Sequence, residues 1–132
     1  MGSGESRRVL AVVGDLFFVA KIREAAKRFR VEVDWAKTMD EALILAERHP
    51  DLVILDLNYD AVSPLSLIGV VKKHAVLGQT PILGFVSHVY EDLKAKAREA
   101  GCDQVVARSS LIQNLLATLE RRSEGGEAPA AP

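Results

Sequence analysis

The sequence predicts an α/β fold in which five parallel strands form one sheet and helices cover both of its faces. Short runs rich in β-branched residues alternate along the chain with longer segments of helical period, a pattern typical of successive βα units. The first run, residues 8–13 (RVLAVV), is almost continuously apolar, as a strand buried on both faces must be. A chain of 132 residues that is 48% hydrophobic can build one core, so we expect a single domain.

The first half of the chain contains two strands, two helices and signals for their ends. After the first strand, apolar residues at helical spacing predict a helix over residues 17–29. Apolar and charged residues alternate over 31–35, which predicts an edge strand with one wet face. Thr38 and Glu41 form a capping box that opens the second helix, which we expect to end near Arg48.

The second half adds three helices, each marked at one end by a capping signal. Ser63 is the expected cap of the third helix, whose first residue is a proline. The fourth helix is expected over residues 90–100, with Gly101 as its C-terminal cap. Ser110 and Gln113 form a capping box for the last helix. The remaining strands are expected over residues 52–55, 81–86 and 104–107.

Composition excludes several classes of function. The 17 basic and 18 acidic residues give a net charge of −1, so we expect no direct nucleic-acid partner. No apolar run approaches the roughly 20 residues of a membrane-spanning helix, so we expect no membrane insertion. Cys102 is the only cysteine and no secretory signal precedes the domain, which favours a cytoplasmic protein. Residues 1–7 and 123–132 are expected to be disordered around a domain of residues 8–122.

Polar residues follow the expected strands at the edge where parallel sheets place their functional groups. Asp15 follows the first strand, Asp56 and Asn58 the third, Ser87 the fourth, and Arg108 the fifth. Two carboxylates from separate loops repel each other unless a cation lies between them, and hard oxygen ligands favour Mg²⁺. Asp15 and Asp56 are therefore a candidate divalent-metal site.

From residue 8 to about residue 121 the chain resembles the receiver domain of two-component response regulators, which are CheY-like proteins. The resemblance is carried by the segments VVGD, PDLVILDLN, TPILGFVSH and AREAGCDQVVARSS. It implies a flavodoxin-like, doubly wound sheet with strand order 2-1-3-4-5. It also implies that Asp56 accepts a phosphoryl group from a histidine kinase. The implied Mg²⁺ ligands are Asp15, Asp56 and the backbone carbonyl of Asn58.

The departures from the family pattern lie at the same site. Gly14 replaces one member of an acidic pair, which predicts weakened Mg²⁺ binding. Val86 lies where a switching Thr or Ser is usual, and valine has no hydrogen-bonding group. Val105 replaces the aromatic switch residue, and Arg108 replaces a lysine with a wider, planar donor.

Two alternatives remain open at this stage. Gly84 could mark a bulge in the fourth strand, which would move Ser87 into the hydroxyl position in place of Val86. Arg108 could pair directly with Asp56 and hold that carboxylate in place without any phosphate. The second alternative describes a permanently fixed site.

The sequence favours a stand-alone, non-enzymatic signalling module with impaired or absent phospho-switching. Its partner is expected to be a histidine kinase or another signalling protein, docked on the fourth helix, fifth strand and fifth helix. The alternative is a functional receiver that is phosphorylated on Asp56 with Mg²⁺. A flavin binder of the same fold is the third hypothesis, but the loop after the first strand lacks the phosphate-binding residues it requires.

Overall fold

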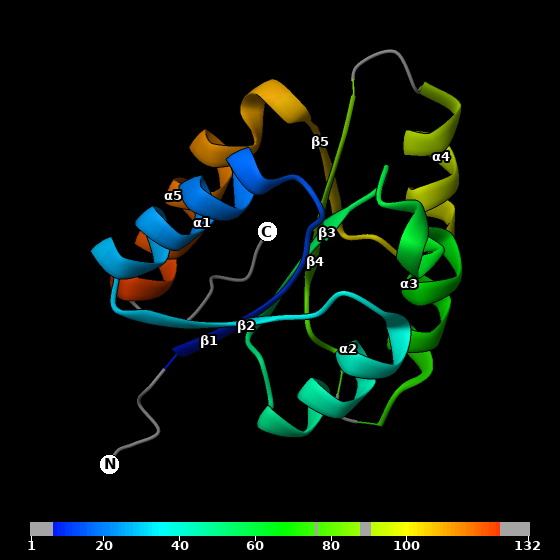
Figure 1. Cartoon of the computed structure of the whole chain (residues 1–132), viewed down its shortest axis with the longest axis horizontal. Helices are drawn as coiled ribbons and strands as arrows, with labels where there is room; N and C mark the ends of the chain where they lie inside the picture. Colours follow the sequence, from blue (N-terminus) through cyan, green and yellow to red (C-terminus); the bar gives the residue numbers. More distant parts are fainter. Residues whose placement is uncertain (1–6, 76, 88–90, 125–132) are drawn as a thin grey trace.

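A computed structural model describes residues 7–75, 77–87 and 91–124, and these form a parallel five-stranded sheet between two layers of helices (Figure 1). The strand order is β2-β1-β3-β4-β5, and every neighbouring pair is parallel, which confirms the predicted α/β class and order. The strands are β1 (Arg7–Val12), β2 (Val31–Trp35), β3 (Leu52–Asp56), β4 (Ile82–Val86) and β5 (Gln104–Ala107). The α-helices are α1 (Leu16–Arg28), α2 (Met39–Leu45), α3 (Pro64–Lys73), α4 (Glu91–Ala100) and α5 (Leu111–Glu124).

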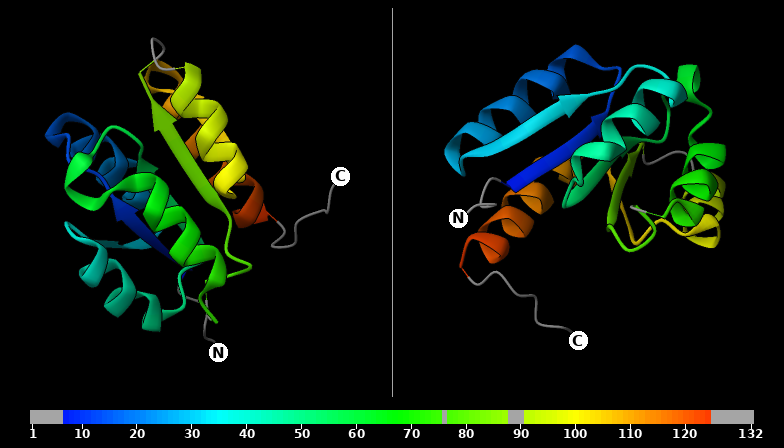
Figure 2. Two further views of the ribbon diagram at one scale, coloured as in Figure 1. Left: turned by 90° about the vertical axis from the view of Figure 1, so that its right-hand side faces the viewer. Right: turned by 90° about the horizontal axis from the view of Figure 1, so that it is seen from below.

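The helices divide between the two faces of the sheet, α1 and α5 on one and α2, α3 and α4 on the other (Figures 1 and 2). Successive side chains of a strand point to opposite faces, so each strand contributes to both cores. In β1, Leu10 and Val12 belong to the core under α2, α3 and α4, whereas Val9 and Ala11 belong to the core under α1 and α5. The continuous apolar runs of the sequence are explained by this double burial.

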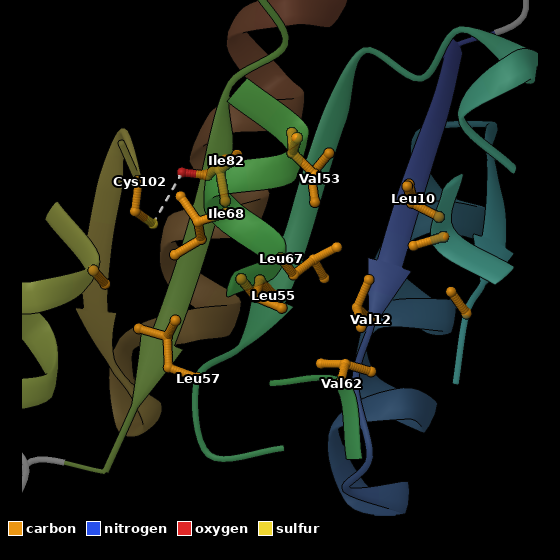
Figure 3. Close-up of a cluster of buried hydrophobic side chains, with 14 of the residues drawn as sticks. Leu10, Val12, Val53, Leu55, Leu57, Val62, Leu67, Ile68, Ile82 and Cys102 are labelled. Carbon is orange, nitrogen blue, oxygen red and sulfur yellow. Dashed lines mark hydrogen bonds between the residues drawn. The ribbon is translucent and has the colours of Figure 1, made fainter. Parts of the chain in front are cut away.

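Figure 3 shows the core on the α2, α3 and α4 face, where side chains of the central strands meet those of α3. Leu55 and Leu67 lie at its centre and are about 1% exposed. Cys102 closes one side, with its thiol donating to the carbonyl of Ile82 at 3.6 Å. Burial raises the pKa of the Cys102 thiol, so this cysteine serves as a core packing residue.

Two helix ends agree with the predicted signals, and a third has a cap that was not predicted. Asp15 is the N-cap of α1, and its carboxylate accepts a hydrogen bond from the backbone N–H of Phe17 at 2.9 Å. Thr38 caps α2 by accepting from the N–H of Glu41 at 3.0 Å. Gly101 ends α4 with a φ of +121°, a conformation that glycine adopts without steric strain.

Several predicted boundaries differ from the structure. β1 begins at Arg7, one residue earlier than expected. α1 also begins one residue early, at Leu16, because Asp15 already caps the helix. Ser63 precedes α3 in a left-handed conformation and makes no side-chain cap, so its predicted role was wrong. Ser110 ends a short 3₁₀ turn, and its carbonyl accepts from the Asn114 side chain at 2.9 Å.

Some predictions fall outside the described residues. These are the predicted start of α4 at Tyr90, and the two termini over residues 1–6 and 125–132. Within the described ranges, no helix has the length and apolar composition needed to cross a membrane.

Candidate functional site

The candidate site lies at the edge of the sheet where β1, β3, β4 and β5 reach their carboxyl ends. Their register pairs Val12 with Leu55, Asp56 with Phe85, and Val86 with Ala107. The residues that follow these strands therefore come from segments far apart in the sequence but belong to one edge. The fold brings together Gly14, Asp15, Asp56, Asn58, Ser87 and Arg108 in this way.

Asp56 is the buried acid of the site, with only 4% of its surface exposed. One of its carboxylate oxygens accepts a hydrogen bond from the backbone N–H of Asn58 at 3.0 Å. Burial raises the pKa of Asp56 above its ordinary value and outweighs the opposing effects of the Asn58 and Gly14 amides and of the Arg108 charge. The negative charge of Asp15 raises this pKa further.

We expect the contribution of Asp56 to stability to fall as the pH rises. Its pKa is about 3.8 in the unfolded chain and higher in the folded one, so the folded state binds the proton more tightly between these two values. The contribution is complete below the unfolded pKa and is lost as the pH rises through the folded pKa. Urea unfolding of the wild type and Asp56→Asn, from about pH 4 to about pH 7, measures the difference.

In that series Asp56→Asn is expected to gain stability relative to the wild type as the pH rises. The exposed Asp60, four residues later in the same loop, provides the control Asp60→Asn. If both variants follow the wild type in parallel across the series, Asp56 is not held in a desolvated site.

Asp15 and Arg108 form the ion pair of the site. Arg108 Nη2 donates to Asp15 Oδ2 at 2.7 Å, and both side chains are about one-third exposed. The other oxygen, Asp15 Oδ1, accepts from the Phe17 amide at the start of α1. Both carboxylate oxygens of Asp15 are thus engaged within the protein. The sequence left open a direct pair between Arg108 and Asp56. In the structure Arg108 pairs with Asp15.

An aromatic stack supports the Arg108 guanidinium. Its Cζ lies 5.2 Å from the centre of the Phe18 ring, within the range of a cation–π contact. Phe18 in turn packs against Phe85 of β4, with ring centres 5.4 Å apart. The guanidinium is held from one side by the Asp15 carboxylate and from another by a ring of the core.

Tyr59 covers Gly14. A Cβ atom added to Gly14 would lie 2.6 Å from two carbons of the Tyr59 ring, a separation that real side chains do not reach. The Tyr59 hydroxyl donates to the carbonyl of Lys37 at 3.4 Å, which ties its loop to the segment after β2. Gly14 has no positive φ, so the close ring contact is the reason that glycine is required here.

Val86 and Ser87 are placed by an unbroken register. Gly84 pairs one for one with Leu55 and with Val105, so the bulge that the sequence left open is absent. A Cβ at Gly84 would lie 3.0 Å from the Cys102 sulfur, which explains the glycine by packing. Val86 is fully buried in the core.

Asn58 joins the ends of β3 and β4. Its side-chain Oδ1 accepts a hydrogen bond from the Ser87 backbone N–H at 3.1 Å, while its own N–H donates to Asp56. The resemblance assigned the backbone carbonyl of Asn58 to the metal. Its side chain instead links the loop after β3 to the loop after β4.

The residues as arranged do not fit a Mg²⁺ ion. Mg²⁺ requires nearly octahedral oxygen ligands, and it is usually held through carboxylates. Gly14 supplies no carboxylate, and both oxygens of Asp15 are bonded to other groups. Within the described parts of the chain, no group of three or more His, Cys, Asp or Glu side chains is arranged to hold a metal.

Comparison with solved structures identifies the fold. A response regulator from Hahella chejuensis matches 93% of this chain and 99% of its own, with a TM-score of 0.80 and 23% sequence identity. The chain has the receiver fold of response regulators. A second receiver match is a response regulator protein from Burkholderia pseudomallei, solved with a phosphorylated aspartic acid, a calcium ion and citrate. It has a TM-score of 0.73 and 22% identity over 90% of this chain and 69% of that one.

Sequence comparison is consistent with the receiver fold. The polar-differentiation response regulator DivK of Brucella ovis is 26% identical over 81 residues. This match covers 61% of the present chain and 66% of DivK, slightly less than two thirds of that relative. No family model matches the chain.

Two residues of the candidate site were missed by reasoning from the sequence. Tyr59 and Phe18 carry no charge and resemble ordinary loop and core residues in the sequence. The available signal was Gly14. A glycine at the position of an expected acid indicates that a neighbouring group occupies the space of the missing side chain. The sequence could not identify that neighbour, since the contact joins loops 45 residues apart.

Proposed function

We propose that this chain is a receiver-type signalling module that acts through contacts with another protein and has impaired or absent phospho-switching. A typical receiver shifts between two surface states when phosphorylation draws in a hydroxyl and an aromatic side chain. In this chain the surface that contacts the partner stays largely the same, with or without a phosphoryl group. The proposal also assigns a cytoplasmic location, because the only cysteine is unpaired and buried.

The observation that carries the proposal is the environment of Val86. This side chain is 0% exposed and belongs to the core under α2, α3 and α4. It has no group that can bond a phosphoryl oxygen. Val105, at the position of the second switch residue, is 5% exposed and lies in the same core. Neither side chain can report a phosphoryl group by moving toward it.

The proposed docking surface comprises α4, β5 and α5. The exposed charges of α4 are of both signs, with Lys96 and Arg98 on the same helix as Glu91, Asp92 and Glu99. A histidine kinase or another signalling protein is the proposed partner for this surface. A pattern of charges on that partner that complements this mixed surface would orient the encounter.

A phospho-accepting receiver is the alternative function. It is favoured by Asp56, which keeps its position at the end of β3, and by Ser87, which lies beside the site and is only half buried. In that case Ser87 would have to supply the hydroxyl that Val86 lacks.

Intact-mass measurement with acetyl phosphate and Mg²⁺ tests the proposal. We expect the wild-type mass to remain unchanged, because Asp56 is buried and its surroundings are already neutralised by Arg108. Asp56→Asn provides the matched control. A single phosphoryl adduct that is present in the wild type and absent from the variant would overturn the impaired switch and establish the alternative.

A further inference from the structure

Two acidic side chains at one edge of a sheet need a positive charge between them. Asp56 is almost completely buried at the end of β3, and Asp15 follows β1, the neighbouring strand, so the two acids lie at one edge of the sheet. The resemblance provides for a divalent cation at this place. In this structure the positive charge has a different source.

The positive charge comes from the protein itself. Arg108 Nη2 lies 2.7 Å from Asp15 Oδ2. The guanidinium is thus bonded to one of the two acids, at the same edge of the sheet as the other. Its five donors and permanent charge suit this role better than a flexible ammonium group would. The guanidinium also lies over the ring of Phe18, 5.2 Å from its centre.

The third carboxylate of a metal site has no room. The ring of Tyr59 would touch any Cβ at Gly14, with the nearest carbons 2.6 Å away. A side chain at position 14 would therefore require the Tyr59 ring to move.

We infer that the Arg108 guanidinium takes the place of the divalent cation in this site, and that the Tyr59 ring fills the volume of the missing carboxylate. This inference rests on the proposed receiver function, since a receiver site is the reason to expect a cation. It makes the ordinary state of the site independent of divalent ions. It also makes divalent binding and the Arg108–Asp15 pair mutually exclusive.

Titration with Mn²⁺ tests the inference directly, because the electron paramagnetic resonance signal of free Mn²⁺ counts the ions that remain unbound. We expect the wild type to bind no Mn²⁺ at millimolar concentrations. Arg108→Ala is expected to bind one ion at least tenfold more tightly than the wild type, since Asp15 is released and the two carboxylates lose their counter-charge. Arg108→Gln, which keeps most of the side-chain length, provides a second variant of the same kind.

The thermal midpoint provides a second readout. Without divalent ions, Arg108→Ala should unfold at a lower temperature than the wild type, and Mn²⁺ should restore the loss. The matched control is Arg8→Gln, which breaks another arginine–aspartate pair, Arg8–Asp34 at 3.1 Å, at the opposite end of β1. This control should gain no Mn²⁺ binding.

The outcomes separate this inference from the proposed function. Equal Mn²⁺ binding by the wild type and Arg108→Ala, or no binding by either, overturns the role of Arg108. If the wild type binds Mn²⁺ yet takes no phosphoryl group, only the inference fails. If the wild type takes the phosphoryl group while only the Arg108 variants gain Mn²⁺, the impaired switch fails and the inference stands.

Discussion

Gly14→Asp, the substitution that would restore a second acid after β1, is expected to destabilise the protein strongly. The new Cβ would lie 2.6 Å from the Tyr59 ring and 3.1 Å from the carbon at the base of that ring, so the whole side chain would have to move. Overpacking of this kind costs about 1–3 kcal/mol. In a domain of this size we expect the thermal midpoint to fall by roughly 4–12 °C.

A double-mutant cycle with Tyr59→Ala identifies the cause. Removal of the ring opens the space, so Gly14→Asp should be much less damaging in the Tyr59→Ala background, with a coupling energy of about 1–2 kcal/mol. Gly69→Ala is the matched glycine control, because nothing lies within 4 Å of a Cβ at that helical position. It should be neutral or stabilising by up to about 1 kcal/mol. Additive effects in the cycle would rule out the contact between the ring and position 14.

The fold was predictable because its signals are local. A buried strand needs a short apolar run, and an amphipathic helix needs apolar residues at helical spacing, so both can be found in a few consecutive residues. Thr38 and Gly101 marked helix ends correctly for the same reason. Ser63 was misleading, because its left-handed backbone prevents the hydroxyl from capping α3. That conformation depends on the preceding loop and has no signature in the sequence.

The site was predictable only as a set of residues. Parallel strands bring their carboxyl ends to one edge, so Asp15, Asp56 and Arg108 were expected to gather there. Which acid pairs with Arg108 depends on the position of its side chain. The Phe18 ring contacts that side chain from a different element, α1. A sequence pattern contains no information on such a contact between side chains remote in the chain.

Phe18→Ala is expected to cause the largest loss of stability among the substitutions considered for the site. Phe18 is 8% exposed and its ring packs against Phe85, whose side chain is fully buried. Truncation of a buried phenylalanine to alanine costs about 3–5 kcal/mol. Since a domain is stable by only about 5–15 kcal/mol, the variant should unfold at much lower urea concentration.

Phe17→Ala is the matched control, because Phe17 precedes Phe18 in the same helix but is 62% exposed. Its effect should lie within about 0.5 kcal/mol, as for most surface substitutions. A similar loss for both variants would show that the ring of Phe18 has no special place in the core.

Phe18→Leu separates the support of Arg108 from the filling of the core, because leucine keeps an apolar side chain without a π face. Combined with Arg108→Gln in a cycle, it should reveal a coupling energy of about 0.5–1 kcal/mol, typical of a partly exposed cation–π pair. If that coupling is present, the single variant Phe18→Leu should also bind Mn²⁺ more tightly than the wild type. Without the aromatic ring beside it, the Arg108 guanidinium separates from Asp15 more often. Zero coupling would mean that Asp15 alone holds Arg108. The position of the guanidinium charge would then not depend on the Phe18 ring.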